Sequence, residues 1–381
     1  MDFLETPEQE RLRESVRAFL RDDPSVRTRS VQEDGWIVGF DRSFSRRLAE
    51  RGWIGMTWPR PYGGAERTYL DRLVVSEELL LAGAPVAAHW FGDRQIGPAL
   101  LAHGNDEQKA GLVPRIARGE VTFCVGMSEP NAGSDLVSLS TRARLCGDAF
   151  RIQGQKIWTS FAEEADYCYL VARTDEEARP HRGISELLVP MDTPGITVRP
   201  IRDMVGETHF GEVFFDDVRV PAGALIGELN QGWYQIMRQL DYERSGIERL
   251  LSNFPLFRDV VRRARETGRT ADPRIRQRIA GIEIALRAGR GMIYRVASML
   301  TEGRVPNFEA AAAKTFCTTL EQSIANLASD LLGPASQLTD GGLLERRAAR
   351  NLMYAPAYTI QGGTNEILRN IIARRGLDLP D

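Results

Sequence analysis

The stretch GMSEPNAGSD, at residues 126–135, is the most informative segment of this 381-residue chain. It offers many hydrogen-bond donors and little side-chain bulk. Gly133 lets a ligand approach the backbone closely and permits a positive φ angle. The hydroxyls of Ser128 and Ser134, together with exposed backbone N–H groups, can bind anionic or carbonyl oxygens. These residues alone fit a plain polar turn equally well, so the interpretation depends on the rest of the chain.

Five further stretches accompany this loop. They are GNDEQK at 104–109, GQKIWTS at 154–160, FFDDVRVP at 214–221, GGTNEI at 362–367 and RNIIAR at 369–374. Together with the loop they resemble the acyl-CoA dehydrogenase family, and the resemblance covers essentially the whole chain. The loop resembles the flavin-binding signature of that family. The stretch at 362–367 resembles the turn that follows its usual catalytic carboxylate. Ten residues matching in order are far more specific than a lone GxGxxG.

The composition is that of a soluble globular protein, with 43% hydrophobic and 27% charged residues. The length predicts two or three domains. A net charge of −3 argues against nucleic acid as a main partner. Acidic residues appear at once at the N-terminus and no apolar run approaches the length of a membrane span. We therefore expect neither a signal peptide nor a transmembrane segment.

The cysteines and histidines predict neither disulfides nor a metal site. The four cysteines form no CxxC pair, and we expect reduced core residues of a cytoplasmic protein. They are Cys124, Cys146, Cys168 and Cys317. The four histidines lack metal-ligand spacing. Of the 49 basic residues only Lys109, Lys156 and Lys314 are lysine, so 49 − 3 = 46 are arginine. This bias is typical of a GC-rich genome.

Three regions differ in their patterning. Residues 1–119 are predicted to be helical, beginning with a capping box at Thr6-Pro7-Glu8-Gln9 and continuing at 41–51, 66–82 and 106–117. Residues 120–224 contain short β-prone runs between Gly- and Pro-rich breaks, at 121–125, 150–158, 167–171, 184–189 and 213–215. Residues 225–381 return to a helical pattern.

This order of helical, β and helical regions is what the acyl-CoA dehydrogenase fold looks like. The resemblance implies an α+β multidomain chain with an N-terminal α-helical domain, a β-barrel-like middle domain and a C-terminal four-helix bundle. It also implies FAD, bound between the middle and C-terminal domains, and α,β-dehydrogenation of an acyl thioester. In that reaction a base removes the α-proton while the β-hydrogen leaves as hydride to flavin N5. The thioester oxygen gains charge and needs hydrogen-bond donors.

The position of the catalytic base departs from the usual pattern. Many members carry the base just before the Gly-Thr pair, where this chain has Gly362. Gly362 cannot act as a base, although the resemblance implies that its backbone N–H polarises the thioester oxygen. Members similar to isovaleryl-CoA and long-chain dehydrogenases carry the carboxylate on a helix of the C-terminal domain. The stretch LDYER at 240–244 matches that context, so the resemblance indicates Glu243.

Hydrophobic spacing supports Glu243 independently. It belongs to a set that steps by 4, 3, 4 and 3 residues, as one face of a helix does: Ile236, Leu240, Glu243, Ile247 and Leu250. Burial in such a stripe would raise the pKa of the carboxyl toward a value useful for a base near neutral pH. The alternative is a partly exposed Glu243 that pairs with Arg238 or Arg244.

The resemblance also implies cofactor and substrate contacts, residue by residue. The implied flavin contacts are Val125, Met127, Ser128, Gly133, Ser134, Trp158, Thr159, Ser160, Thr364 and Glu366. The implied contacts to the acyl thioester are Ser134, Arg244 and Gly362. Trp158 matches an aromatic residue packed on the isoalloxazine ring, with a core tryptophan as the alternative. For Arg244 the alternative is a cation on the helix surface.

Several functions stay open at this point. The leading hypothesis is an FAD-dependent acyl-CoA dehydrogenase of fatty acid or lipid catabolism that passes electrons to an electron-transfer flavoprotein-like partner. A second hypothesis keeps the chemistry but has the thioester on a carrier protein. A third is a non-catalytic subunit of a heteromer, which Gly362 favours and Glu243 opposes. A fourth is an oxidase that uses O₂ directly. Short, branched, long and steroid-type acyl groups all remain candidate substrates.

Assembly is open as well. Residues 245–258 and 330–336 depart from the segments with which the family usually holds the FAD phosphates across a subunit interface. Both a homo-oligomer, dimer or tetramer, and a heterotetramer with a related subunit agree with these departures.

Overall fold

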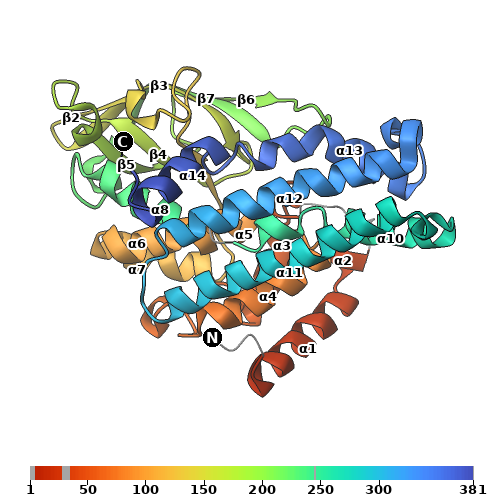
Figure 1. Ribbon diagram of the computed structural model, residues 1–381. Helices are drawn as coiled ribbons and strands as arrows, with labels where there is room; N and C mark the ends of the chain where they lie inside the picture. The colour runs from red at the N-terminus through yellow and green to blue at the C-terminus, as the bar shows by residue number, and fades with distance from the viewer. Residues whose placement is uncertain (1–4, 28–34, 244–245, 381) are drawn as a thin grey trace. The chain divides into compact units, whose positions relative to one another are not determined.

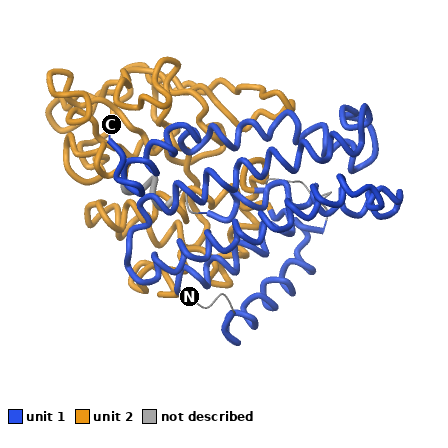
Figure 2. The backbone as a smooth tube through the Cα atoms, in the orientation of Figure 1, with its two compact units in different colours: residues 1–35, 68–84, 241–381 blue, residues 36–67, 85–240 orange. Residues whose placement is uncertain are grey.

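The computed structural model describes residues 5–27, 35–243 and 246–380. Figure 2 shows two compact units, each built from segments that are far apart in the sequence. Unit 1 comprises residues 1–35, 68–84 and 241–381, and unit 2 comprises residues 36–67 and 85–240. Each predicted flavin stretch therefore belongs wholly to one unit: 126–135 and 154–160 to unit 2, and 362–367 to unit 1.

The described part of unit 1 contains helices and no β-strand. Its N-terminal segments supply α1 (Pro7–Asp22), α2 (Pro24–Arg27) and α4 (Tyr69–Leu81). Its C-terminal segment supplies α9 (Glu248–Leu251), α10 (Phe254–Glu266), α11 (Pro273–Thr301), α12 (Phe308–Leu332), α13 (Leu343–Tyr358) and α14 (Asn365–Ile371). Helix α12 packs against α10, α11, α13 and α14 (Figure 1). The C-terminal four-helix bundle predicted from the sequence is confirmed in α10 to α13.

The first helix begins where the sequence predicts. The Thr6 hydroxyl accepts the Gln9 N–H at 3.2 Å, and the Gln9 side chain accepts the Thr6 N–H at 3.1 Å. This reciprocal pair is the predicted capping box. Local contacts of this kind need no tertiary partner, which explains why they are readable from the sequence.

Ion pairs join the N-terminal helices of unit 1 to its C-terminal bundle. Arg13 on α1 donates to Glu77 on α4 at 2.7 Å, and Arg290 on α11 donates to the same carboxylate at 2.7 Å. Burial raises the pKa of Glu77, but the two guanidinium groups outweigh it and hold the pKa below its ordinary value. One charged carboxylate thus links three helices that are far apart in the sequence.

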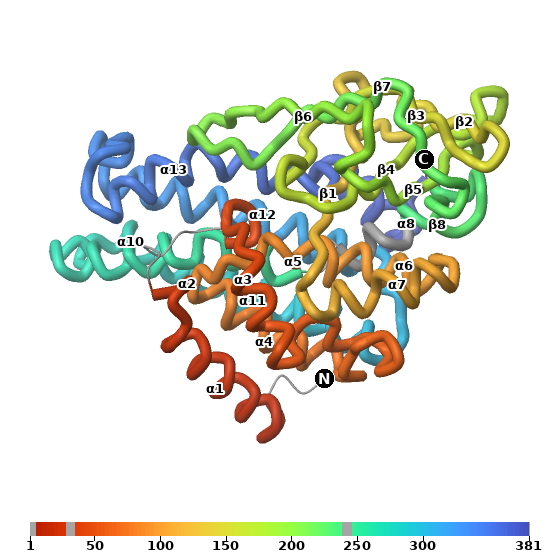
Figure 3. The backbone as a smooth tube through the Cα atoms, turned by 180° about the vertical axis from the view of Figure 1, so that it is seen from behind, coloured from red at the N-terminus to blue at the C-terminus, as the bar shows by residue number. Residues whose placement is uncertain are grey.

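Unit 2 combines helices with one mixed sheet (Figures 1 and 3). Its helices are α3 (Arg42–Glu50), α5 (Ala87–Phe91), α6 (Gly97–His103), α7 (Asp106–Ala117) and the start of α8 (Gly232–Glu243). Its strands are β1 (Phe123–Gly126), β2 (Arg142–Cys146), β3 (Ala149–Ser160), β4 (Tyr167–Arg173), β5 (Ile184–Pro190), β6 (Ile196–Ile201), β7 (Phe210–Pro221) and β8 (Leu225–Ile226). The strand order is β6-β7-β3-β2-β4-β5-β8, and β1 pairs in parallel with β4.

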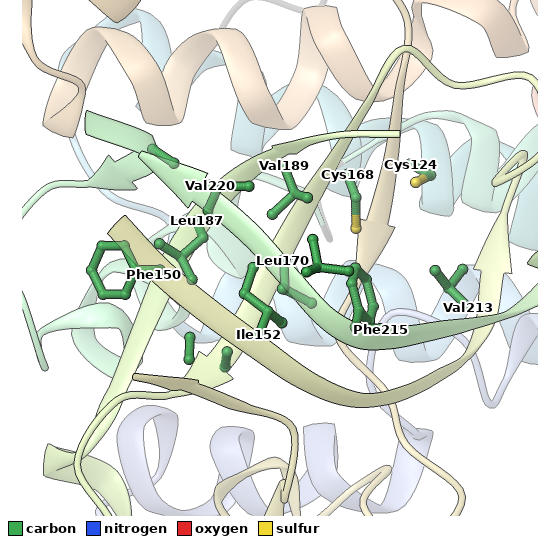
Figure 4. Close-up of a cluster of buried hydrophobic side chains, with 14 of the residues drawn as sticks. Cys124, Phe150, Ile152, Cys168, Leu170, Leu187, Val189, Val213, Phe215 and Val220 are labelled. Carbon is green, nitrogen blue, oxygen red and sulfur yellow. The ribbon is translucent and has the colours of Figure 1, made fainter. Parts of the chain in front are cut away.

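Side chains from six strands, β1 to β5 and β7, fill the core of this sheet (Figure 4). Ile152 on β3, Leu170 on β4, Leu187 on β5 and Val213 on β7 are fully buried. Buried and half-buried residues alternate along the first half of β7, because successive side chains of a strand point to opposite faces. The core therefore packs β3 against β7, and β3 carries one of the two predicted flavin stretches of unit 2.

Two features of unit 2 differ from the sequence predictions. Strands β2, β6 and β8 were not predicted. β2 reads RARLC with one buried residue, β6 includes Pro200 at the edge of the sheet, and β8 is only two residues long. None of these strands contains the continuous apolar run that marks the buried strands of this sheet. The expectation of four core cysteines is wrong for Cys146, which is exposed at the end of β2, whereas the other three are buried.

Two features are absent from the described residues. No helix there is long and apolar enough to cross a membrane. Likewise, no group of three or more His, Cys, Asp or Glu residues in the described ranges could hold a metal ion.

Candidate functional site

The predicted flavin loop of unit 2 begins where β1 ends. Gly126 closes this strand, which runs parallel to β4. A Cβ at Gly126 would lie 2.8 Å from Cys168 Sγ and 3.2 Å from Leu170 Cδ1. The close approach of the two strands therefore requires a glycine at the point where the loop leaves the sheet.

The loop then makes a tight turn. Glu129 and Ala132 exchange backbone hydrogen bonds of 2.9 and 3.1 Å. Beyond the turn, Gly133 and Ser134 are exposed. A Cβ at Gly133 would meet nothing within 4 Å, so the space beside this residue is open. Earlier in the loop, Ser128 is half-buried.

A buried ion pair lies beside this turn. Lys156 on β3 donates to Glu129 at 2.8 Å and to the Met127 carbonyl at 3.0 Å. Glu129 also accepts the Ser140 N–H and hydroxyl, at 2.6 and 2.7 Å, and the Thr141 N–H at 2.9 Å. Burial raises the pKa of Glu129, but Lys156 and these donors outweigh it and lower the pKa to about 2. The loop is thus tied to β3 by the buried ion pair between Lys156 and Glu129.

The second predicted flavin stretch, residues 154–160, lies at an irregularity in β3. Its pairing with β7 shifts register between Lys156 and Thr159. Within this interval Trp158 has φ of +59° and is 54% exposed. A bulky residue seldom adopts a left-handed backbone, and such strain concentrates at functional sites. The alternative of a core tryptophan is wrong, and the exposed indole can stack on a planar ligand.

The two predicted flavin stretches of unit 2 are joined through their backbones. The Ile157 N–H donates to the Ser128 carbonyl at 2.9 Å. Next to it, Thr159 is fully buried and its hydroxyl has no hydrogen-bond partner in the described ranges. Ser160 and Val125 are half-buried.

The third stretch, in unit 1, is a glycine turn that leads into α14. Gly362 and Gly363 have φ of +68° and +87°, which favour glycine at both positions. The Thr364 hydroxyl caps α14. Lys314 on α12 donates to the Gly363 carbonyl at 2.7 Å and to the Asn365 side chain at 3.2 Å. This turn is thus tied to the bundle by a buried ammonium group.

Glu366, the other implied flavin contact in this stretch, is exposed. Its carboxylate lies 3.4 Å from Arg369 on the same helix. A pair this exposed contributes little to stability, so the carboxylate can reorient toward a ligand.

The predicted base lies at the end of α8. Glu243 is the last residue of this helix. The side chain of Glu243 and all of Arg244 lie outside the described residues.

The apolar stripe predicted around Glu243 is not one continuous helix face. Gly246 and Ile247 are not helical, and α9 begins at Glu248. Glycine has low helix propensity, which explains a break at this point. Ile247 and Leu250 are nevertheless buried, as the stripe predicted.

Sequence reasoning missed a buried carboxyl near the start of α8. Glu186 on β5 is fully buried, and Gln235 on α8 donates to it at 2.6 Å. Burial raises the pKa of Glu186 to about 7, and the nearby Tyr169 and Gln235 side chains offset only part of that effect. The signal was present in the sequence, because one acidic residue interrupts the apolar run ISELLVP at 184–190.

The residues of each unit fit a flavin by their chemistry. Unit 2 offers an exposed indole face at Trp158 and two half-buried hydroxyls, Ser128 and Ser160, beside open space at Gly133. Unit 1 offers the half-buried Thr364 at a turn that places no side chain at 362 or 363. A planar ring flanked by carbonyl and N–H groups needs such an aromatic face and such donors.

Comparison with known proteins gives three matches to family models. They are the acyl-CoA dehydrogenase N-terminal domain at residues 6–120, the middle domain at 124–218 and the C-terminal domain at 230–377. The acyl-CoA dehydrogenase IpdE1 of Mycobacterium tuberculosis is 38% identical over 343 residues, which cover 89% of this chain and 88% of that protein.

Two solved structures are similar over the full length. The structure titled "Tcur3481-Tcur3483 steroid ACAD" has a TM-score of 0.90 and 33% identity, and the match covers 100% of both chains. The ChsE4-ChsE5 complex from Mycobacterium tuberculosis has a TM-score of 0.86 and 34% identity, again over 100% of both chains. Because sequence, domain order and fold all agree, this chain belongs to the acyl-CoA dehydrogenase family, whose members are FAD-dependent oxidoreductases.

Proposed function

We propose that this chain catalyses the α,β-dehydrogenation of an acyl thioester, with Glu243 as the base that removes the α-proton. The observation that carries the proposal is that a carboxylate is missing at the usual position of the base and present at the alternative one. Gly362 has no side chain at the usual position of the base, and Glu243 ends α8 in the context that matches the alternative position. The bound flavin would accept the β-hydrogen as hydride.

The remaining tasks fall to residues of the chain itself. The Trp158 indole would pack against the flavin ring, and the hydroxyls of Ser128, Ser160 and Thr364 would hydrogen-bond to the cofactor. The Gly362 N–H stabilises the charge that develops on the thioester oxygen. The other proposed flavin contacts are Val125, Met127, Gly133, Ser134, Thr159 and Glu366, and Ser134 and Arg244 also contact the thioester.

We propose a bulky, polycyclic acyl group and a heteromeric assembly. The similarity to a structure titled as a steroid ACAD supports the acyl group. Two similar structures carry titles that name a pair of chains, which supports a second, related subunit. An electron-transfer flavoprotein-like acceptor would reoxidise the flavin.

Anaerobic bleaching of bound FAD tests the base. Wild type and Glu243→Gln are mixed with steroid-type, long, branched and short acyl-CoAs. Glu266→Gln is the matched control, because Glu266 lies on the surface of α10 with 60% of its side chain exposed. We expect bleaching in wild type and control, and a rate on the order of 10²–10⁴ lower in Glu243→Gln, which retains FAD. A Glu243→Gln variant that bleaches at the wild-type rate would refute the assignment.

The second candidate is a non-catalytic subunit of a heteromer, which the absent carboxylate at Gly362 favours. It predicts a chain that binds FAD or a partner subunit and whose flavin no thioester reduces. Adding carrier-protein thioesters to the same bleaching assay separates this outcome from a change of substrate carrier.

A further inference from the structure

The lysines of this chain are rare and unusually buried. Lysine occurs at three positions among 49 basic residues. Lys156 and Lys314 are both 0% exposed, whereas Lys109 on α7 is half-buried. In a chain that otherwise uses arginine, two fully buried lysines indicate sites where a guanidinium group does not serve.

Lys156 holds the flavin loop of unit 2 at one carbonyl. Its ammonium reaches the Met127 carbonyl at 3.0 Å, and its charge is balanced by Glu129 at 2.8 Å. Its stem is also enclosed, because a Cβ at Gly126 would lie 3.4 Å from Lys156 Cγ and 2.8 Å from Cys168 Sγ. A compact ammonium on an unbranched stem fits this space, and a planar guanidinium is larger and fans its donors apart.

Lys314 makes the equivalent contact in unit 1. Its ammonium reaches the Gly363 carbonyl at 2.7 Å and Asn365 Oδ1 at 3.2 Å. The Thr318 hydroxyl, one turn further along α12, donates to the same Asn365 oxygen at 3.2 Å. The end of the glycine turn and the first residue of α14 are thus held together from α12.

Peptide geometry converts each held carbonyl into an oriented N–H group. In a planar trans peptide the C=O and the following N–H point in opposite directions, and the described residues contain no cis peptide. Holding the Met127 carbonyl therefore points the Ser128 N–H away from Lys156. In the same way, holding the Gly363 carbonyl points the Thr364 N–H away from Lys314. Neither N–H donates a hydrogen bond within the described ranges.

We propose that Lys156 and Lys314 are positioning residues that orient the Ser128 and Thr364 N–H groups toward FAD. This inference rests on the proposed function only in assigning those two residues to the flavin. Each lysine sets the conformation of one stretch, residues 126–135 or residues 362–367. Their loss lowers FAD affinity through the backbone of that stretch rather than through the fold.

The test uses the apoprotein, so that it needs neither substrate nor a competent base. The variants are Lys156→Arg, Lys314→Arg and the double variant Lys156→Met/Glu129→Gln, which leaves no unpaired buried charge. Lys109→Arg is the matched control. Amide hydrogen exchange is measured peptide by peptide, and FAD is titrated into each protein.

We expect amide exchange at least tenfold faster in residues 126–135 for the Lys156 variants and in residues 362–367 for Lys314→Arg. We expect each of these variants to bind FAD at least tenfold more weakly than wild type, and Lys109→Arg to match wild type. The proposal is overturned by a folded variant whose own stretch exchanges at the wild-type rate. Exchange accelerated throughout the protein, or failure of all three to fold, overturns it as well by showing a role in the whole fold.

These results are separate from the test of Glu243. An active Glu243→Gln protein would remove the base assignment and leave the exchange and FAD results standing. Conversely, unchanged exchange in the lysine variants would remove this inference while bleaching by wild type still supported the dehydrogenase.

Discussion

Replacing Glu186 by glutamine should raise the free energy of unfolding relative to wild type, and this gain should be larger at alkaline pH than at acidic pH. Glu186 is fully buried on β5 and bonds Gln235 on α8 at 2.6 Å. No cation pairs with it in the part of the chain that the structure describes. Ionising this carboxyl therefore places an unpaired charge in the core of unit 2, which is unfavourable.

The magnitude follows from the two pKa values. The pKa of Glu186 is about 7 in the folded protein, against an ordinary value of 4.5. Between these values the folded state holds a proton that the unfolded state has lost, so stability falls as pH rises from 4.5 to about 7. The difference of about 2.5 pKa units corresponds to about 3 kcal/mol, at about 1.36 kcal/mol per unit. Glutamine does not ionise, so the variant escapes this loss.

Urea unfolding at pH 5, 6, 7 and 8 measures the effect. We expect the free energies of unfolding of wild type and Glu186→Gln to differ least at pH 5. Between pH 5 and pH 8 the variant should gain up to about 3 kcal/mol of unfolding free energy relative to wild type. Glu163→Gln is the control, because Glu163 is exposed in the same unit. A difference between wild type and Glu186→Gln that stays constant from pH 5 to 8 would refute the reasoning.

Three further predictions concern stability. Gly154→Ala should lower the midpoint of urea unfolding, because φ is +152° and a Cβ would lie 2.7 Å from Thr141 Cα. Gly281→Ala, at an open position within α11, should instead raise the free energy of unfolding by about 0.5–1 kcal/mol. Thr364→Ala should lose about 1 kcal/mol by removing the cap of α14 and Thr364→Ser should not, as measured by urea unfolding of the apoprotein. Glu129→Gln should be less stable than wild type at neutral pH, and the gap should close in acid unfolding as pH falls from 4.5 through about 2, since the pKa of Glu129 is held near 2.

Much of the fold was predictable because it rests on local contacts. The capping box at Thr6 and Gln9, and a helix over 106–117, depend on residues within one or two turns. The core strands were recognisable by their apolar runs. By contrast β2 and β6 are defined by pairing with β3 and β7, since β2 is mostly exposed and β6 has no fully buried residue.

The candidate site divides in the same way. The stretches at 126–135, 154–160 and 362–367 were identified from their residues, because glycines, hydroxyls and their order are properties of the chain. The sequence could not show that Trp158 is exposed at a register shift with a left-handed backbone, since that follows from the pairing of β3 with β7. It also predicted a continuous helix face from Ile236 to Leu250, which the break at Gly246 interrupts.

By itself, then, the sequence determined the family, the chemistry it implies and the residues that are candidates for that chemistry, because these depend on which side chains are present and in what order. Only the tertiary structure decided which charges are buried and what they hold. Lys156 meets Glu129 across 27 positions of sequence, Lys314 meets Gly363 across 49, and Glu186 meets Gln235 across 49. Contacts over such separations leave no local pattern, and burial, which sets their energy, exists only once the chain has folded.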